Sequence, residues 1–483
     1  MTARIAGRRY CTIFLSLLVA STLLSLPGAA AEDLTILDAI EEFLFRVEQL
    51  DFAQYLARTA ILSGQPEDYE TSCREIISIL AEPPQSQFSK PSISQIGLIT
   101  WAYRVADDPV LLSSIRPSIK SDYLHSQLLV LEYLQFALSE CEQTVEAGKT
   151  VGESEQHLKK AYAFLTAALG TTDPTSPAVG LKAAEAMLPQ EVVFLSPGDS
   201  IQEAVDRLAA GGVIFLEPGE YEDQCIVISC PVWIARSPNA SSRVRIGGGH
   251  AGEPVFLARG EAADIEFSAL TIAEGSSAIR LEANASCWVS DCTLIENDFA
   301  GVEATGNSAI IITDSLVRGN YMYGVIATDA AQVSLACCDV SLNVFAAMQP
   351  IGAGIAASDH TTLNVQDCSV IGNSGYGIIL SGSAALSATE LSITYSQHSG
   401  LHLQQASQAY LVECRIAING YWDISTYNPD CYAEHNGDWQ PAKAFTGSLE
   451  GIDNTSQVYG DGYRTCLGDY ALPEGFFPVP GGK

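Results

Sequence analysis

The chain has 483 residues, with 57 acidic against 25 basic side chains and a formal net charge of −32. Such an acidic surface repels nucleic acid, anionic lipid and polyuronates unless a cation bridges them, so we expect no nucleic-acid partner. The length leaves room for two domains and a large core.

The N-terminus has the order of a secretory signal peptide. Arg4, Arg8 and Arg9 precede an apolar stretch over 13–26, and small residues follow it. We therefore predict that residues 1–31 are a signal peptide and that the protein is secreted, periplasmic or held at the cell surface. Its removal takes three arginines and no acids, which changes the charge from −32 to −35. No later segment reaches the roughly 18 apolar residues of a membrane span, so none is expected after cleavage.

The pattern from residue 32 to 190 is helical. Apolar side chains recur at three- and four-residue steps, as in the run that starts at Leu128 and ends at Leu138. Helix breakers lie at 64–66, 83–84 and 109. We predict a small α-helical domain of five or six helices, without a motif that specifies chemistry, for which a protein partner is one candidate role. A tetratricopeptide-like array stays open, although no repeat of roughly 34 residues supports it.

The pattern from residue 191 to 422 is that of a repeat. Three aliphatic columns lie one, eleven and sixteen positions after each repeat start, so we predict three short strands per coil that face one interior. Such coils bury their apolar faces only by stacking on neighbours. Right-handed connection of parallel strands is strongly favoured, and the leucine-asparagine pattern of leucine-rich repeats is absent. The predicted coils start at Ala278, Gly301, Gly324, Gly354, Gly377, Gly400 and Asp423. The steps between these starts are 23, 23, 30, 23, 23 and 23 residues.

Two further columns of the repeat carry polar or sulfur side chains. Position nineteen is an asparagine in five of six coils, and coils stacked about 4.8 Å apart would bring these amides into hydrogen-bonding register. Position fourteen mixes cysteine with serine and leucine, which favours buried, reduced thiols over redox or metal chemistry. The asparagines are Asn297, Asn320, Asn343, Asn373 and Asn419, and the cysteines are Cys292, Cys338, Cys368 and Cys414.

The segment before the repeats predicts an N-terminal cap. Ser200 is a suitable N-cap residue, Glu203 stands at capping-box spacing, and Gly211 ends the short helix before a strand. A polar helix over the open end of the first coil would block edge-to-edge association. At the other end we predict that the repeat stops at 422 and that residues 423–483 form a C-terminal cap. A disulfide between Cys431 and Cys466 could stabilise this cap.

The cap and the repeats together resemble the pectin-lyase-like superfamily of right-handed parallel β-helix proteins, over about residues 192–480. The resemblance implies the fold, but it does not specify an activity, because the superfamily contains lyases, hydrolases, epimerases and proteins without known catalysis. The catalytic motifs of its polygalacturonase-like and alginate-epimerase-like members are absent from the predicted β-helix. No family catalytic residue can therefore be carried over.

Pectate-lyase-type elimination needs a base, and the repeats offer little to serve as one. No lysine occurs between Lys182 and Lys443. Arg280 has Glu282 and Glu303 as near neighbours in the predicted register, which favours an ion pair over a catalytic base. We therefore expect no cleavage of pectate or alginate by elimination.

The best remaining candidates for catalysis are Asp329, Asp359 and His360. Both aspartates stand five positions after a coil start on adjacent coils, and paired carboxylates at that spacing could serve glycoside hydrolysis or bind calcium. The alternative is that aspartate simply favours the turn at this position. An insertion around 345–353 should project near the same coils. No cofactor is expected, and the sequence does not decide whether a metal ion is bound.

Two functions are compatible with the sequence. The first is an exported, non-catalytic β-helix scaffold that binds a polysaccharide, a cell-surface glycan or another surface component. The second is a divergent carbohydrate-active enzyme, a glycoside hydrolase rather than a polysaccharide lyase. A pocket of convergent carboxylates would favour the enzyme. The nearly uncharged first-strand face, with Ile326, Thr328, Ala356 and Ser358, suits a neutral ligand.

Overall fold

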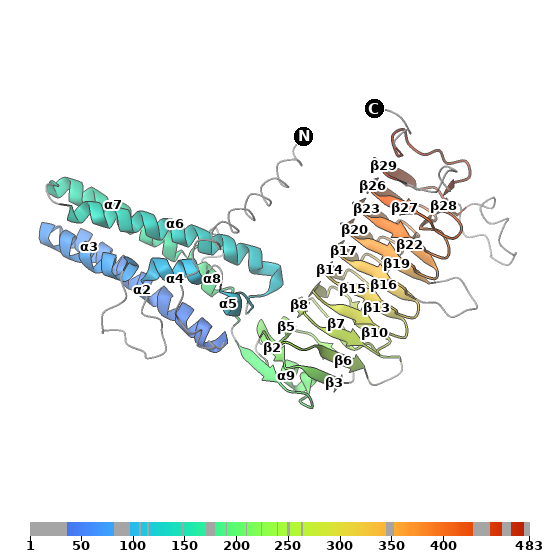
Figure 1. Cartoon of the computed structure of the whole chain (residues 1–483), viewed down its shortest axis with the longest axis horizontal. Helices are drawn as coiled ribbons and strands as arrows, with labels where there is room; N and C mark the ends of the chain where they lie inside the picture. Colours follow the sequence, from blue (N-terminus) through green and yellow to red (C-terminus); the bar gives the residue numbers. More distant parts are fainter. Residues whose placement is uncertain are drawn as a thin grey trace.

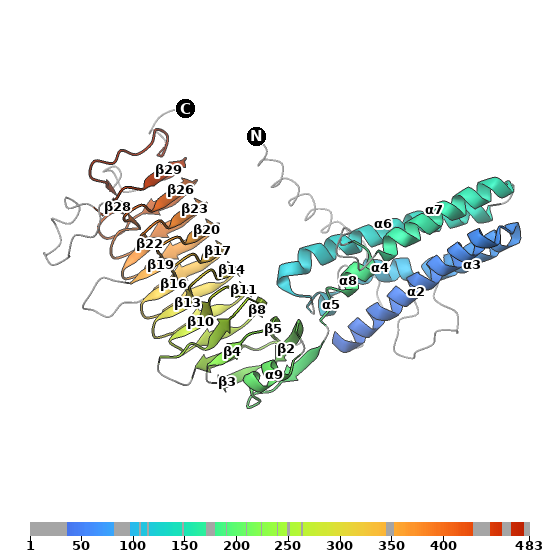
Figure 2. The same cartoon turned by 180° about the vertical axis from the view of Figure 1, so that it is seen from behind.

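The structure is a computed structural model with two parts, a helical domain and a β-solenoid (Figures 1 and 2). The predicted signal peptide and Cys431 lie outside the described residues, and so does most of the insertion around 345–353. The described residues are 36–81, 97–105, 108–113, 115–146, 149–170, 179–189, 191–208, 210–223, 225–238, 240–248, 252–261, 264–343, 352–427, 445–455 and 465–477.

The helical domain has four long helices and several short ones. Two of the predicted breakers are confirmed, since a helix ends at Ser63, the next begins at Pro66 and another begins at Pro109, while the breaker at 83–84 lies outside the described residues. The count among the described residues exceeds the predicted five or six, because the shortest helices give too little periodicity to be seen in the sequence. The helices are α2 (Ile36–Ser63), α3 (Pro66–Ala81), α4 (Leu98–Val105), α5 (Pro109–Ser113), the 3₁₀ helix η1 (Pro117–Ile119), α6 (Lys120–Val145), α7 (Val151–Leu169) and α8 (Leu181–Glu185).

Apolar packing and one complete cap define these helices. Phe43 of α2 and Leu134 of α6 are fully buried in one core. Thr150 starts α7 with a capping box, in which its hydroxyl accepts from the backbone of Glu153 and the Glu153 carboxylate accepts in return. Among the described residues, no helix combines the length and the apolar character needed to cross a membrane.

The β-solenoid consists of three parallel sheets, which we name A, B and C, so the predicted fold class is confirmed. Sheet A has 11 strands, sheet B has 9 and sheet C has 10. Sheet A contains β1 (Val192–Leu195), β2 (Gly212–Leu216), β5 (Val232–Arg236), β8 (Asp264–Ser268), β11 (Ser286–Ser290), β14 (Ala309–Thr313), β17 (Gln332–Ala336), β20 (Thr362–Gln366), β23 (Ala385–Thr389), β26 (Gln408–Val412) and β29 (Ser448–Ile452).

Each regular coil adds one strand to every sheet, and sheet C carries the predicted first strand of the repeat. Sheet B contains β3 (Gly219–Asp223), β6 (Val244–Gly248), β9 (Thr271–Ala273), β12 (Thr293–Ile295), β15 (Leu316–Arg318), β18 (Asp339–Ser341), β21 (Ser369–Ile371), β24 (Ser392–Thr394) and β27 (Arg415–Ala417). Sheet C contains β4 (Ile226–Ile228), β7 (Phe256–Arg259), β10 (Ser277–Glu282), β13 (Ala300–Ala304), β16 (Tyr323–Ala327), β19 (Ala353–Ala357), β22 (Tyr376–Leu380), β25 (Leu401–Leu403), β28 (Ile424–Thr426) and β30 (Thr465–Cys466).

The predicted register is the observed register. Ile279 pairs with Val302, as the regular step of the repeat requires. The longer step does not disturb the stack, because Tyr323 pairs with Ala353 and Val325 with Ile355. The three aliphatic columns point inward and form one continuous core. The strands therefore fix which side chains face outward on each sheet.

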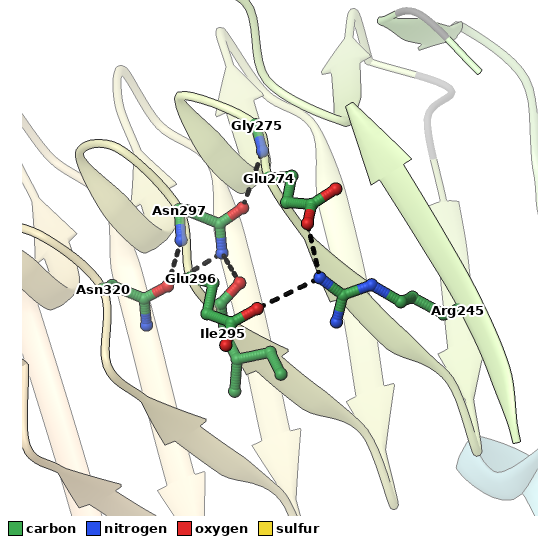
Figure 3. A network of polar contacts seen from close by, with 7 residues as sticks. All are labelled: Arg245, Glu274, Gly275, Ile295, Glu296, Asn297 and Asn320. Carbon is green, nitrogen blue, oxygen red and sulfur yellow. Dashed lines mark hydrogen bonds and ion pairs between the residues drawn. The ribbon is translucent and has the colours of Figure 1, made fainter. Parts of the chain in front are cut away.

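The asparagine ladder forms at the turn between sheets B and C. The Asn297 amide donates to Asn320 Oδ1 at 2.8 Å (Figure 3). Asn320 in turn donates to Asn343 at 3.1 Å, and Asn343 donates to Asn373 at 3.0 Å. The first four members thus make one hydrogen-bonded column, as predicted. The fifth, Asn419, occupies the same position two coils further on and is buried.

The predicted column of thiols is also confirmed. Cys292, Cys338, Cys368 and Cys414 are free and buried, whereas their neighbour Cys337 is exposed. Outside the column, Cys466 is disulfide-bonded.

Iodoacetamide is expected to modify Cys337 in the folded protein while the four column thiols stay unmodified. Burial raises the pKa of Cys292 to about 12, so this thiol is both inaccessible and un-ionised. Burial and then Asp314 and Asp367 also raise the pKa of Cys337, so its modification should accelerate only as the pH rises beyond the ordinary cysteine pKa of about 8.5. Peptide mass spectrometry with and without denaturant checks this. Modification of Cys338 in the folded protein, or a bridge to Cys368, would contradict it.

The N-terminal end of the solenoid is capped by a short helix, as expected. Helix α9 (Ile201–Arg207) starts at Ser200, whose hydroxyl accepts from the backbone of Glu203. The Glu203 carboxylate forms an ion pair with Arg207 at 2.9 Å, so among the described contacts only half of the capping box is present.

At the C-terminal end, stacking continues past Asp423, where the sequence predicted the cap to begin. Strands β28, β29 and β30 extend sheets C and A. Gln408 pairs with Ser448, so the regular step that marks the earlier coils is lost in this last one. The Tyr470 hydroxyl donates to the Leu449 carbonyl and accepts from its amide, which covers part of the last edge.

The helical domain contacts the outer face of sheet A at the N-terminal end of the solenoid. Val213, Phe215 and Trp233 form an apolar patch there that packs with Ile40 of α2. On β8, the Glu266 carboxylate accepts from the Ser118 backbone at 3.1 Å and from its hydroxyl at 2.7 Å. Figures 1 and 2 show the rest of sheet A extending away from this contact.

Candidate functional site

The structure places Asp329, Asp359 and His360 together, in the turns between sheets C and A. All three are exposed, and both aspartates have positive φ angles, 62° and 59°. Their carboxylates accept hydrogen bonds within the turns. Asp329 Oδ2 accepts from the Gly306 amide at 2.9 Å, and Asp359 Oδ2 accepts from the Ser358 hydroxyl at 2.9 Å. The geometry gives these residues a structural role, and their part in catalysis stays a prediction.

Arg280 forms the ion pair that the sequence predicted. Its Nε lies 2.6 Å from Glu303 Oε2, while Glu282 pairs with Arg259 at 3.1 Å. A guanidinium held by a carboxylate does not act as a base at neutral pH. Arg280, the arginine considered as a catalytic base, is therefore engaged in an ion pair between neighbouring strands.

The outer face of sheet C is lined by an apolar cluster. Tyr323 and Ala356 are buried there, and the side chains of Ile326 and Ile379 pack against them. The outer face of sheet C is therefore uncharged at its centre, as predicted. Its side chains pack against one another there and leave no hollow for a ligand among the described residues.

A histidine and a serine approach each other on the same face. His402 Nδ1 lies 2.8 Å from Ser425 Oγ, and the imidazole stacks on Tyr376. This is the distance of a nucleophile and its base. However, both residues are only 2% exposed. Burial, and next the charge of His398, lower the pKa of His402 to about 3, so the imidazole is a weak base. We interpret the pair as a packing contact.

A hollow of about 320 Å³ lies on the outer face of sheet A. Its floor includes Leu335 and Val365, and its polar groups are hydroxyls and amides. None of the nine residues that line it is ionisable. They are Ile311, Ser334, Leu335, Ala336, Asn364, Val365, Gln366, Ser387 and Thr389.

The hollow exists because three consecutive strands carry a small side chain at the centre of their outer face. Ser334, Asn364 and Ser387 stand in register on β17, β20 and β23. On either side of them the same column holds Ile311 and Tyr410, which are 38% and 49% exposed. This site was not predicted, because the only outward face considered as a ligand surface was that of the first strand of each coil. The signal was present ten positions after each coil start.

A second hollow, of about 410 Å³, lies on the outer face of sheet B. Its lining includes Glu220, Arg243 and Arg245. Arg245 bridges Glu274 at 2.8 Å and Glu296 at 3.0 Å (Figure 3). Three carboxylates thus accompany two guanidinium groups, and this hollow presents no net positive charge to an anionic ligand.

No metal centre is evident in the described part of the chain. Nowhere in it do three or more histidine, cysteine, aspartate or glutamate side chains come close enough to hold an ion. The hollow on sheet A, which offers only neutral groups, is therefore the site whose geometry best suits a ligand.

Comparison with known proteins agrees with the observed fold. Residues 255–416 match the family described as a right handed beta helix region. The right-handed β-helix fold that the sequence predicts is therefore confirmed over these residues. No curated protein matches the sequence of this β-helix protein.

Several solved structures resemble the β-helix protein at low identity. Pectate lyase Pel9A is 11% identical, over 56% of this chain and 79% of that chain, with a TM-score of 0.39. The alginate lyase from Paenibacillus sp. is 12% identical, over 58% and 98%, with a TM-score of 0.41. The mannuronan C-5 epimerase AlgE4 A-module from Azotobacter vinelandii is 13% identical, over 57% and 97%, with a TM-score of 0.37. Likeness at this level says nothing about activity.

Proposed function

We propose that this β-helix protein binds a neutral polysaccharide without cleaving it, and that the hollow on sheet A is the binding site. The observation that carries the proposal is the lining of the hollow, which supplies hydroxyls and amides but no ionisable side chain. Sugar hydroxyls hydrogen-bond to such groups. Hydrolysis or elimination would need a general acid or base within reach of the ligand, which this lining lacks.

Two features support a sugar chain as the ligand. Side chains on successive strands repeat about every 4.8 Å along the stack, so Asn364 and its neighbours offer a regular row of donors and acceptors. Tyr410, at one end of the row, exposes a ring on which a sugar face could pack.

The charge of the surroundings favours a neutral over an acidic polysaccharide. The residues just beyond the hollow, at the turn into sheet B, include Asp314, Asp367 and Glu390, all of which carry a carboxylate. Their field adds to the net charge of −32 and opposes an approaching polyuronate.

The test is calorimetric titration of the mature protein with cellohexaose, mannohexaose, xylohexaose and an oligogalacturonate. We expect at least one neutral hexasaccharide to bind, the oligogalacturonate not to bind, and no new reducing ends to appear on long incubation. Failure of all three neutral sugars to bind would overturn the proposed site, and release of reducing ends would overturn the non-catalytic role.

Asn364→Asp is expected to weaken that binding about tenfold, which corresponds to about 1.4 kcal/mol. The substitution keeps the shape of the side chain, removes its only donor group and adds a charge to a neutral lining. Asn307→Asp is the matched control, because Asn307 is an exposed asparagine of the same solenoid that does not line the hollow. Equal loss in both variants would indicate a general charge effect and count against the site.

We also propose that the protein is exported through residues 1–31, on the pattern of charged, apolar and small residues described above. Edman sequencing of protein recovered from the exported fraction should give a chain that starts near Glu32. Recovery of the unprocessed chain in the cytoplasm alone would contradict export.

A further inference from the structure

The helical domain and the hollow share one face of the solenoid. The apolar patch around Trp233 on β5 packs with Ile40 of the helical domain. On β8, the next strand, Glu266 holds Ser118 of η1 through two hydrogen bonds. The first strands of the outer face of sheet A are therefore occupied by protein.

Only one strand separates this contact from the hollow. The strand order in sheet A is β5, β8, β11 and β14, and Ile311 of β14 is the first side chain of the hollow. Two strand spacings amount to about 10 Å. Trp288 of β11 lies between the domain contact and the hollow, in register with Glu266 on one side and Ile311 on the other. Its indole is half-buried.

The other end of the hollow is different. Beyond Tyr410 of β26, the described part of the sheet ends with β29. Figures 1 and 2 show this end of sheet A remote from the helical domain. A ligand that lies along the row of Ser334, Asn364 and Ser387 is thus blocked by the helical domain at the β8 end. At the β26 end it can extend past Tyr410 beyond the solenoid.

We propose that the hollow receives the end of a neutral polysaccharide chain, with the terminal sugar toward Trp288 and the chain leaving over Tyr410. The inference rests on the proposed function and adds the part of the polymer that is bound. The helical domain acts as the stop, because its contact with Glu266 lies about 10 Å from the first side chain of the hollow on the same face.

The test counts protein molecules per sugar chain. Soluble homopolymers of the same three sugars, each in a short and a long size fraction, are saturated with the full mature protein, and the complexes are sized by analytical ultracentrifugation. We expect the number of proteins per chain to be the same in both fractions. A number that rises in proportion to chain length would overturn end recognition but leave the binding site intact. Absence of binding to both the hexasaccharides and the polymers would instead be the failure of the proposed function.

A variant tests the stop itself. Ser118→Glu places a second carboxylate against Glu266 and should release the helical domain, which an increased radius of gyration in X-ray scattering would report. With the domain released, we expect the number of proteins per long chain to rise while the affinity for the hexasaccharide is unchanged. An unchanged number in a variant that scattering shows to be released would rule out the helical domain as the stop.

Discussion

Asn343→Ala is expected to lower the free energy of unfolding by about 3 kcal/mol. Asn343 Oδ1 accepts from the backbone and the side-chain amide of Asn320, each at 3.1 Å, and its own amide donates to Asn373. All three asparagines are at most 2% exposed, so the backbone N–H of Asn320 and one of its two amide hydrogens would remain buried without an acceptor, while the other amide hydrogen keeps the Leu294 carbonyl. Each such group costs about 1–3 kcal/mol. Urea unfolding followed by circular dichroism measures the change.

Asn307→Ala is the matched control for this substitution. Asn307 belongs to the same stack, but it is exposed and its amide donates to Asn284, another exposed asparagine. A surface change of this kind alters stability by about 0.5 kcal/mol or less. If the two variants unfolded at the same urea concentration, the ladder would not be the stabilising element that its hydrogen bonds indicate.

Glu266→Lys should separate the helical domain from the solenoid. Glu266 is 3% exposed and accepts both hydrogen bonds of Ser118. A lysine at this position would bury a cation near Arg116 and leave the two donors of Ser118 without their acceptor, at a cost of about 3 kcal/mol or more. We expect a larger radius of gyration in X-ray scattering and an unchanged unfolding transition of the solenoid. A compact variant would mean that the apolar patch alone holds the domains.

The same contact should depend on pH. Burial raises the pKa of Glu266, and the donors of Ser118 and the charge of Arg116 offset this only in part, while Asp264 adds to it. Docking is therefore most favourable below the ordinary glutamate pKa of about 4.3, and it weakens as the pH rises through the raised pKa of the docked carboxyl. Glu266→Gln, which keeps an acceptor oxygen, should remove this dependence. A profile that is identical in the variant would assign it to another group.

Much of the solenoid could be predicted from the sequence because its period is visible in single residues. Gly301 and Gly324 mark successive coils, and the column that includes Asn320 and Asn343 lies at a fixed distance from them. Nearest-neighbour stacking turns that one-dimensional regularity directly into the parallel register that is observed.

The parts that were not predicted depend on long-range contacts or on a broken period. The hydrogen bonds between Ser118 and Glu266 join residues 148 positions apart, and no local pattern announces them. Stacking beyond Asp423 escaped prediction because Gln408 and its partner Ser448 are separated by much more than the regular step of the repeat. The hollow corresponds to small outward-facing residues around Asn364, which are visible in the sequence. That the helical domain covers the same face of sheet A follows only from the structure.

The tolerance of the stack to one longer coil has a practical side. Tyr323 and Ala353 are paired strand neighbours although the step between them exceeds the regular one, and Ile355 and Ile378 resume the usual spacing immediately afterwards. Extra sequence between residues 343 and 352 therefore leaves no trace in the coils on either side. In protein engineering this junction, which connects β18 of sheet B to β19 of sheet C, is an attachment point. An epitope, a second binding module or a fluorescent reporter could be inserted there without altering sheet A, which carries the hollow.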